Sequence, residues 1–155
     1  MLLRVIAVGT RMPRWVQEGF ADYAGRLQGE YRLELVEIAL GPRSGGDTQQ
    51  AIRKEGEKML AQLRDSSYVV ALQVTGRALS SEQLAQFLTR QASSSREIAF
   101  CIGGPDGLAP EVDARARLRW SLSALTLPHA LARVIVAEAL YRAVMIGMGH
   151  PYHRG

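Results

Sequence analysis

The chain has 155 residues, of which 47% are hydrophobic, a length that suits one domain with a substantial core and is too short for two. We therefore interpret residues 1–155 as a single domain. The longest apolar stretch, residues 130–148, is interrupted by two arginines and a glutamate, which argues against a membrane span. Cys101 is the only cysteine, so an internal disulfide framework is excluded and a reducing compartment, the cytoplasm, is expected.

The net charge of +4 is distributed unevenly along the chain. From Ala114 onward six arginines accompany one acid, Glu138, whereas the 13 basic residues before that point are outnumbered by 14 acids. A basic region of this kind attracts phosphate backbones, although a solvated helix surface can carry the same asymmetry. Nucleic acid is therefore a candidate partner, and the arginines concerned are Arg115, Arg117, Arg119, Arg133, Arg142 and Arg154.

Short β-branched runs alternate with amphipathic segments along the chain. The apolar runs predict strands at residues 2–8, 31–38, 68–74 and 98–102, and an extended piece near Trp120. Helical spacing, helped by prolines at three starts, predicts helices within residues 13–27, 52–63, 80–88, 110–118 and 128–147. Ser80 with Gln83 three residues later resembles a capping box. The Gly/Pro/Ser stretch at 41–47 predicts a mobile loop.

This alternation predicts an α/β sandwich around a mostly parallel sheet. In such folds ligands bind beyond the carboxyl ends of the strands, where we expect the loops 73–79, 103–107 and 121–127. The chain has no glycine-rich phosphate loop and no complete G-x-G-x-x-G motif, which argues against a dinucleotide site.

The last helix is apolar around nearly its whole circumference, whereas a surface helix normally has a polar face. It therefore needs neighbours on several sides. One interpretation packs it between the sheet and a second copy of the chain, in a two-fold dimer. The other makes it a wholly central helix of a monomer. We favour the dimer.

Five motifs occur in order along the chain: GTRMPRW near the start, KEGEKML in the second helix, IGGPDGL after the fourth strand, SALTLPHALARVIVAEALYRA, and a terminal HPYHR. Together they resemble the bacterial ribosomal large-subunit methyltransferase H family of the SPOUT class, over essentially the whole chain. The resemblance implies a SPOUT-type α/β/α sandwich with a mostly parallel five- to six-stranded sheet and a C-terminal trefoil knot. It also implies a homodimer.

The family resemblance implies a reaction, in which S-adenosylmethionine donates a methyl group to N3 of a pseudouridine. The target lies in the intersubunit stem-loop of large-subunit ribosomal RNA, on the assembled ribosome. By the same resemblance, the cofactor pocket is formed by Leu72, Gly103 and the run Leu122, Ser123, Ala124, Leu125, Thr126 and Leu127.

The residues of the expected pocket suit a flat nucleoside. Glycine at 103 and 104 lets the backbone approach a ligand closely, although Gly103 and Gly104 would serve an ordinary turn equally well. The leucines offer apolar contacts. The chain departs from the family pattern at Gln73 and Arg77, where an acidic residue and a lysine are more common.

Methyl transfer to an imide nitrogen requires removal of its proton, so a base is needed. His129, His153 and Tyr152 are candidates, and the sequence leaves the assignment open. Tyr152 can also stack on a flipped base, and Arg154 can face a ring oxygen or a phosphate. Two histidines without a third ligand are weak grounds for zinc, so no metal is expected.

Two other functions remain compatible with the residues alone. One is a flavodoxin-like enzyme that binds another nucleotide. The other is a non-catalytic, ribosome-associated factor that uses its basic face. Each differs from a methyltransferase in its expected affinity for S-adenosylmethionine.

Overall fold

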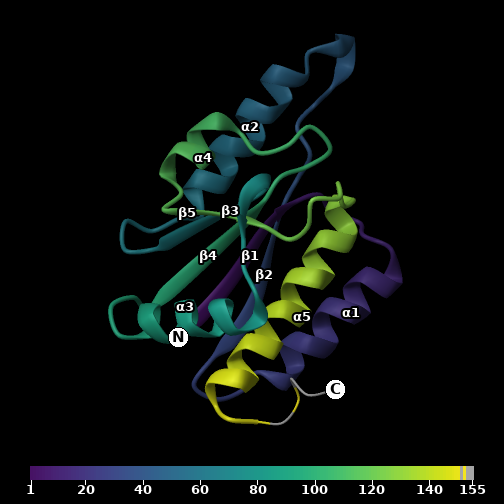
Figure 1. Ribbon diagram of the computed structural model, residues 1–155. Coiled ribbons are helices and arrows are strands. Elements are labelled where there is room, and N and C mark those ends of the chain that lie inside the picture. Colours follow the sequence, from purple (N-terminus) through teal and green to yellow (C-terminus); the bar gives the residue numbers. More distant parts are fainter. Residues whose placement is uncertain (151, 153–155) are drawn as a thin grey trace.

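The computed structural model describes residues 1–150 and 152 (Figure 1). In this part of the chain five strands form one sheet in the order β2-β1-β4-β3-β5, and every neighbouring pair is parallel. This confirms the predicted α/β class and parallel sheet. The strands are β1 (Leu2–Val8), β2 (Arg32–Ile38), β3 (Tyr68–Ala78), β4 (Glu97–Ile102) and β5 (Leu118–Ser121).

Helices cover both faces of the sheet, giving three layers. The strand β1 shows why, because its side chains alternate between two apolar cores: Leu3 and Val5 face one, and Ile6 and Val8 face the other. The first core is covered by α1 (Arg14–Arg26), α3 (Ser81–Ala92) and α5 (His129–Gly147), the second by α2 (Thr48–Ala61) and α4 (Pro110–Arg115).

Local sequence signals explain where several helices begin. The capping box at Ser80 is present as predicted, because its hydroxyl accepts from Gln83 N and the Gln83 side chain accepts from Ser80 N. Asp47 caps α2 by accepting a hydrogen bond from Gln50 N. Part of the predicted loop 41–47 forms a short 3-10 helix, Ser44–Gly46.

The third strand is longer than predicted. The expected loop 73–79 is wrong for most of its length, because β3 continues to Ala78 and pairs again with β5. Leu72 and Arg77 are both in register with Trp120, so the four residues between them form a bulge. Gly76 fits there because a Cβ atom would lie 2.7 Å from the carbonyl carbon of Arg119. The bulge turns the strand towards the space beyond β4.

The last helix lies between α1 and α3 against the sheet (Figure 1). This central position in one chain buries much of its apolar surface. Its outer stripe remains partly exposed and carries Leu131, Ile135, Glu138, Arg142 and Ile146. Within the described residues, no helix is long and apolar enough to cross a membrane.

Two glycines in helices give a matched test of the packing. At Gly56 a Cβ atom would overlap the Cβ of Ala109, where α2 crosses the start of α4, whereas at Gly25 a Cβ atom would meet nothing within 4 Å. We expect Gly56→Ala to lower the free energy of unfolding by about 1–3 kcal/mol through overpacking. Gly25→Ala should raise it by up to about 1 kcal/mol through helix propensity. Urea unfolding monitored by circular dichroism measures both, and equal effects would contradict this packing.

Candidate functional site

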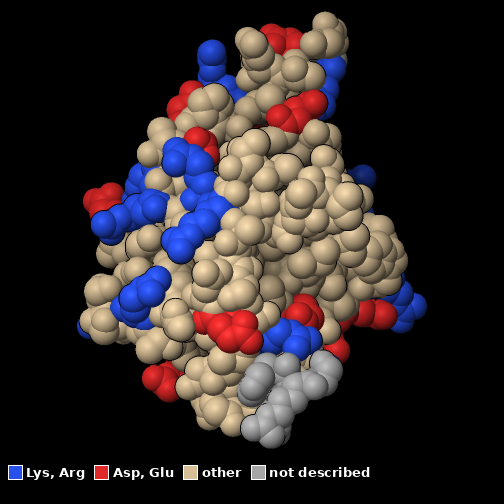
Figure 2. Space-filling model, in the orientation of Figure 1, with Lys and Arg blue, Asp and Glu red and all other residues tan. Residues whose placement is uncertain are grey.

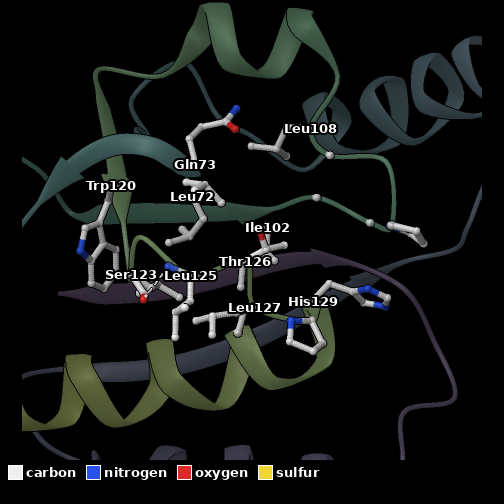
Figure 3. Close-up of a pocket in the computed structure, with 18 residues that line it drawn as sticks. Leu72, Gln73, Ile102, Leu108, Trp120, Ser123, Leu125, Thr126, Leu127 and His129 are labelled. Atoms are coloured by element: carbon white, nitrogen blue, oxygen red, sulfur yellow. Dashed lines mark hydrogen bonds between the residues drawn. The ribbon is translucent and has the colours of Figure 1, made fainter.

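A cavity of about 450 Å³ opens beyond the carboxyl end of β4, beside the bulge in the middle of β3. Three segments far apart in the sequence line it: the β3 bulge, the turn that follows β4, and the stretch between β5 and α5 (Figure 3). Eight of the nine predicted cofactor residues line this cavity; Ala124 lies in the third segment but is not part of the lining. The eight are Leu72, Gly103, Gly104, Leu122, Ser123, Leu125, Thr126 and Leu127.

The turn after β4 folds back tightly on itself. The amide of Gly107 donates to the carbonyl of Gly104 at 3.1 Å, and Gly107 has a φ of +89°, in the left-handed region. A Cβ atom on Gly103 would overlap the backbone of Gly107 and Leu108. A Cβ on Gly104 would lie 2.9 Å from Val8 Cγ1. The two glycines are therefore required by packing inside the protein, in addition to any approach of a ligand.

The segment between β5 and α5 forms the apolar rim of the cavity. Leu125 N donates to Ser123 Oγ at 2.9 Å, which shapes the segment locally. Leu125 is 71% exposed, and Val74 of the β3 bulge, which also lines the cavity, is 50% exposed. Exposed apolar side chains that converge on a cavity are typical of a ligand-binding site. Figure 3 shows Leu72 of β3 on one side of the cavity and Leu125 and Leu127 of the segment between β5 and α5 on the other.

Several lining residues were not among the predicted site residues. Trp120 is 3% exposed and packs edge-on against Phe100 at 5.9 Å, so it is both a core residue and part of the cavity wall. Gln73 lines the cavity and donates to Asp113 Oδ1 at 3.1 Å, which ties the bulge to α4. Gln73 thus has a hydrogen-bond partner within its own chain, Asp113, whereas Arg77 is exposed.

His129 is the first residue of α5 and lines the cavity. Burial lowers its pKa, and the positive charge of Arg133 one turn later lowers it further. Arg133 is 1% exposed and donates to Glu37 at 2.8 Å and to the carbonyl of Gly9 at 3.2 Å. Burial removes Arg133 from the basic surface that the sequence suggested. Its signal in the sequence was an arginine between apolar neighbours in the first half of a mostly apolar helix.

Tyr152 lies near the other end of α5. Its hydroxyl donates to Glu138 Oε2 at 3.0 Å. The centroid of its ring lies 4.7 Å from the centroid of the Tyr141 ring and 5.0 Å from Cζ of Arg142. Glu138 and Arg142 also pair with each other at 3.0 Å. Burial, then the bond to Glu138, raise the pKa of Tyr152 to about 12. The phenol therefore keeps its proton at neutral pH.

Within one chain, His129 and Tyr152, the two predicted catalytic residues that the structure describes, lie far apart. At 1.5 Å per residue, the twelve residues from His129 to Tyr141 span about 18 Å of helix, and Tyr152 lies beside Tyr141. The other two predicted residues, His153 and Arg154, lie outside the described residues. Among residues 1–150 and 152, no group of three or more His, Cys, Asp or Glu side chains could hold a metal ion.

Positive charge gathers beside the cavity. Figure 2 shows Lys and Arg side chains over the side of the molecule where β3, β5 and α4 lie, and a largely uncharged surface over the first half of α5. Side chains of both charges lie near α1 and the second half of α5. Arg77 at the end of β3 is exposed, and Arg119 in β5 is half exposed although it pairs with Asp113 at 3.0 Å. Arg117 lies 5.3 Å above the ring of Tyr68. This surface attracts anions.

The sequence and fold can be compared with those of known proteins. A family model described as "Predicted SPOUT methyltransferase" matches residues 1–153. Proteins named "Ribosomal RNA large subunit methyltransferase H" are 54% identical in Pseudomonas paraeruginosa and 52% identical in Azotobacter vinelandii, each over 99% of this chain and 100% of the relative. The solved structure of a probable methylase family protein from Haemophilus influenzae Rd KW20 has a similar fold, with a TM-score of 0.53, 17% identity, and coverage of 97% of this chain and 69% of that chain. The chain therefore belongs to the SPOUT methyltransferase family.

Proposed function

We propose that this protein is a methyltransferase that uses S-adenosylmethionine to methylate N3 of a pseudouridine in large-subunit ribosomal RNA. We further propose that it acts in the cytoplasm on the assembled ribosome. The observation that carries the proposal is the convergence of the predicted cofactor residues on one cavity. It is supported by the end-to-end similarity to relatives named as ribosomal RNA large subunit methyltransferases.

The cavity has the size and chemistry for the cofactor. Its volume of about 450 Å³ lies within the usual range for small-molecule sites. Leucine side chains supply apolar walls, and the irregular backbone of residues 122–127 supplies hydrogen-bonding groups. When bound, S-adenosylmethionine supplies a methyl group activated by its sulfonium. The chain's own residues must hold the acceptor ring in line and take its proton.

His129 suits the role of proton acceptor. It lines the cavity, and its lowered pKa keeps the imidazole neutral at pH 7, with a lone pair available. Tyr152 keeps its proton in the arrangement described above, which favours binding or stacking over proton removal. The exposed arginines beside the cavity suit the phosphate groups of an RNA substrate.

The path of the chain supports a trefoil knot. Strand β5 lies at the edge of the sheet next to β3, yet α5 returns to the middle of the α1–α3 face. Residues 122–127 must therefore cross the β3 bulge and the carboxyl end of β4, where the cavity lies. We propose that this crossing passes through a neighbouring loop, as in the family's knot.

A homodimer would allow His129 of one chain and the tail of the other to meet at one site. The outer stripe of α5 exposes apolar side chains such as Leu131 and Ile135, which suit a second copy of the helix. In an antiparallel pair, the tail of one chain lies near the cavity of the other. We propose that Tyr152, His153 and Arg154 act on the partner's cavity.

Calorimetry and turnover together test the proposed reaction. We expect saturable binding of S-adenosylmethionine. Methyl transfer to whole ribosomes should be faster than transfer to naked ribosomal RNA, because a small protein needs the shape of the ribosome around the target nucleotide to select it. Deleting the last five residues should abolish turnover and leave cofactor binding largely intact. Ribosome binding without any affinity for the cofactor would instead indicate a non-catalytic factor.

The pH dependence tests the base. Because the pKa of His129 is lowered, we expect the rate to fall only below about pH 6.5 as the imidazole gains a proton. Arg133→Gln removes a nearby positive charge, so the pKa of His129 should rise and the acid limb of the rate should move to higher pH. Titration of the histidine resonances by nuclear magnetic resonance measures the shift, with His150 as the internal control. If the pKa of His129 shifts and the acid limb of the rate does not move, His129 is excluded as the base.

Mixed dimers test the shared site. We expect inactive His129→Ala chains and inactive tail-deleted chains to regain activity when mixed. One cavity in each mixed dimer then combines an intact His129 with an intact tail, so about a quarter of the wild-type rate should return with random exchange. If each tail serves its own chain, mixing restores nothing. Native mass spectrometry, which separates the mixed dimer from both parents by the mass of the deleted residues, confirms that subunits exchange.

A further inference from the structure

Arg43 connects three separate parts of the chain behind the cavity. Its Nη1 donates to Glu55 Oε2 at 2.7 Å and to the carbonyl of Gly41 at 3.0 Å, and its Nε donates to Asp106 Oδ2 at 2.9 Å. Gly41 follows β2, Glu55 belongs to α2, and Asp106 lies in the turn after β4. Arg43 itself is not among the residues that line the cavity.

Glu55 holds one end of this connection firmly. The residue is 2% exposed, and its Oε2 accepts from Gly41 N at 2.9 Å as well as from Arg43. A buried carboxylate without a cation is strongly destabilising, so Glu55 fixes the guanidinium in place. A Cβ atom on Gly41 would overlap the backbone of Ala51, so the segment is also packed tightly against α2.

Asp106 connects the other end to the cavity wall. It lies between Pro105 and Gly107, which both line the cavity, within the turn closed by the bond from Gly107 N to Gly104 O. Its side chain is 38% exposed, so burial alone does not hold it. The guanidinium of Arg43 bonds Glu55 through Nη1 and Asp106 through Nε. The single ammonium of lysine does not reproduce this arrangement.

We propose that Arg43 is a positioning residue, which holds the 103–107 wall of the cavity in its binding shape by bridging buried Glu55 to Asp106. The inference rests on the proposed function, because the affected property is affinity for S-adenosylmethionine. A wall that is ordered before binding loses less conformational freedom when the ligand arrives. The affinity therefore depends on a guanidinium that makes no contact with the ligand.

A double-mutant cycle tests the bridge with the full-length chain. We expect Arg43→Lys and Asp106→Asn each to weaken binding of S-adenosylmethionine about tenfold in calorimetry. The double variant should bind no more weakly than the weaker-binding of the two single variants. Asp106→Asn should leave the melting temperature nearly unchanged because the Arg43–Asp106 pair is partly exposed. Arg14→Lys and Glu18→Gln, in an exposed pair on α1, are the matched controls and should bind as the wild type does.

Hydrogen exchange gives a second readout that needs no ligand. The amide of Gly107 should exchange faster in Asp106→Asn and Arg43→Lys than in the wild type, because its bond to Gly104 opens more often. Unchanged affinity in both variants, or additive losses in the cycle, would overturn the proposal while leaving the methyltransferase function intact. A wild-type chain that fails to bind S-adenosylmethionine would overturn the proposed function, and the claim about affinity with it. Unchanged Gly107 exchange would then also rule out the role in holding the turn.

Discussion

The site depends on the tight turn after β4. Gly103 lies so close to the backbone of Gly107 and Leu108 that any side chain there would displace the turn. Because β4 is a central strand, paired with both β1 and β3, its end is a rigid base for that turn. The β3 bulge and residues 122–127 then close the remaining sides of the cavity. The three segments that line the cavity, although distant in the sequence, are thus positioned around one rigid element.

The long helix α5 has two separate functions in this arrangement. Its first turn presents His129 to the cavity and buries Arg133, whose bonds to Glu37 and Gly9 attach the helix to β2 and to the end of β1. Its last turns hold Tyr152 against Tyr141 and Glu138. The apolar circumference that the sequence shows is mostly explained by packing within one chain. The partly exposed stripe is what remains for a partner.

Sequence reasoning predicted the elements well where the signal was local. Strand β1 has the predicted bounds, and the capping box at Ser80 starts α3 as expected, because both depend on neighbouring residues alone. The continuation of β3 beyond Val74 was missed, because it depends on pairing with β5, 43 residues later in the chain. The glycine and leucine positions of the cavity were found through the family resemblance. Arg43 was not found, because its partners Glu55 and Asp106 meet only in the folded chain.

Binding of S-adenosylmethionine by the three segments can be followed by nuclear magnetic resonance, in a titration of the isotopically labelled protein with this compound. We expect saturable shifts of the amides of Leu72, Gly103 and residues 122–127, with a common dissociation constant. Saturable shifts confined to another surface, or the absence of shifts at millimolar ligand, would contradict this expectation.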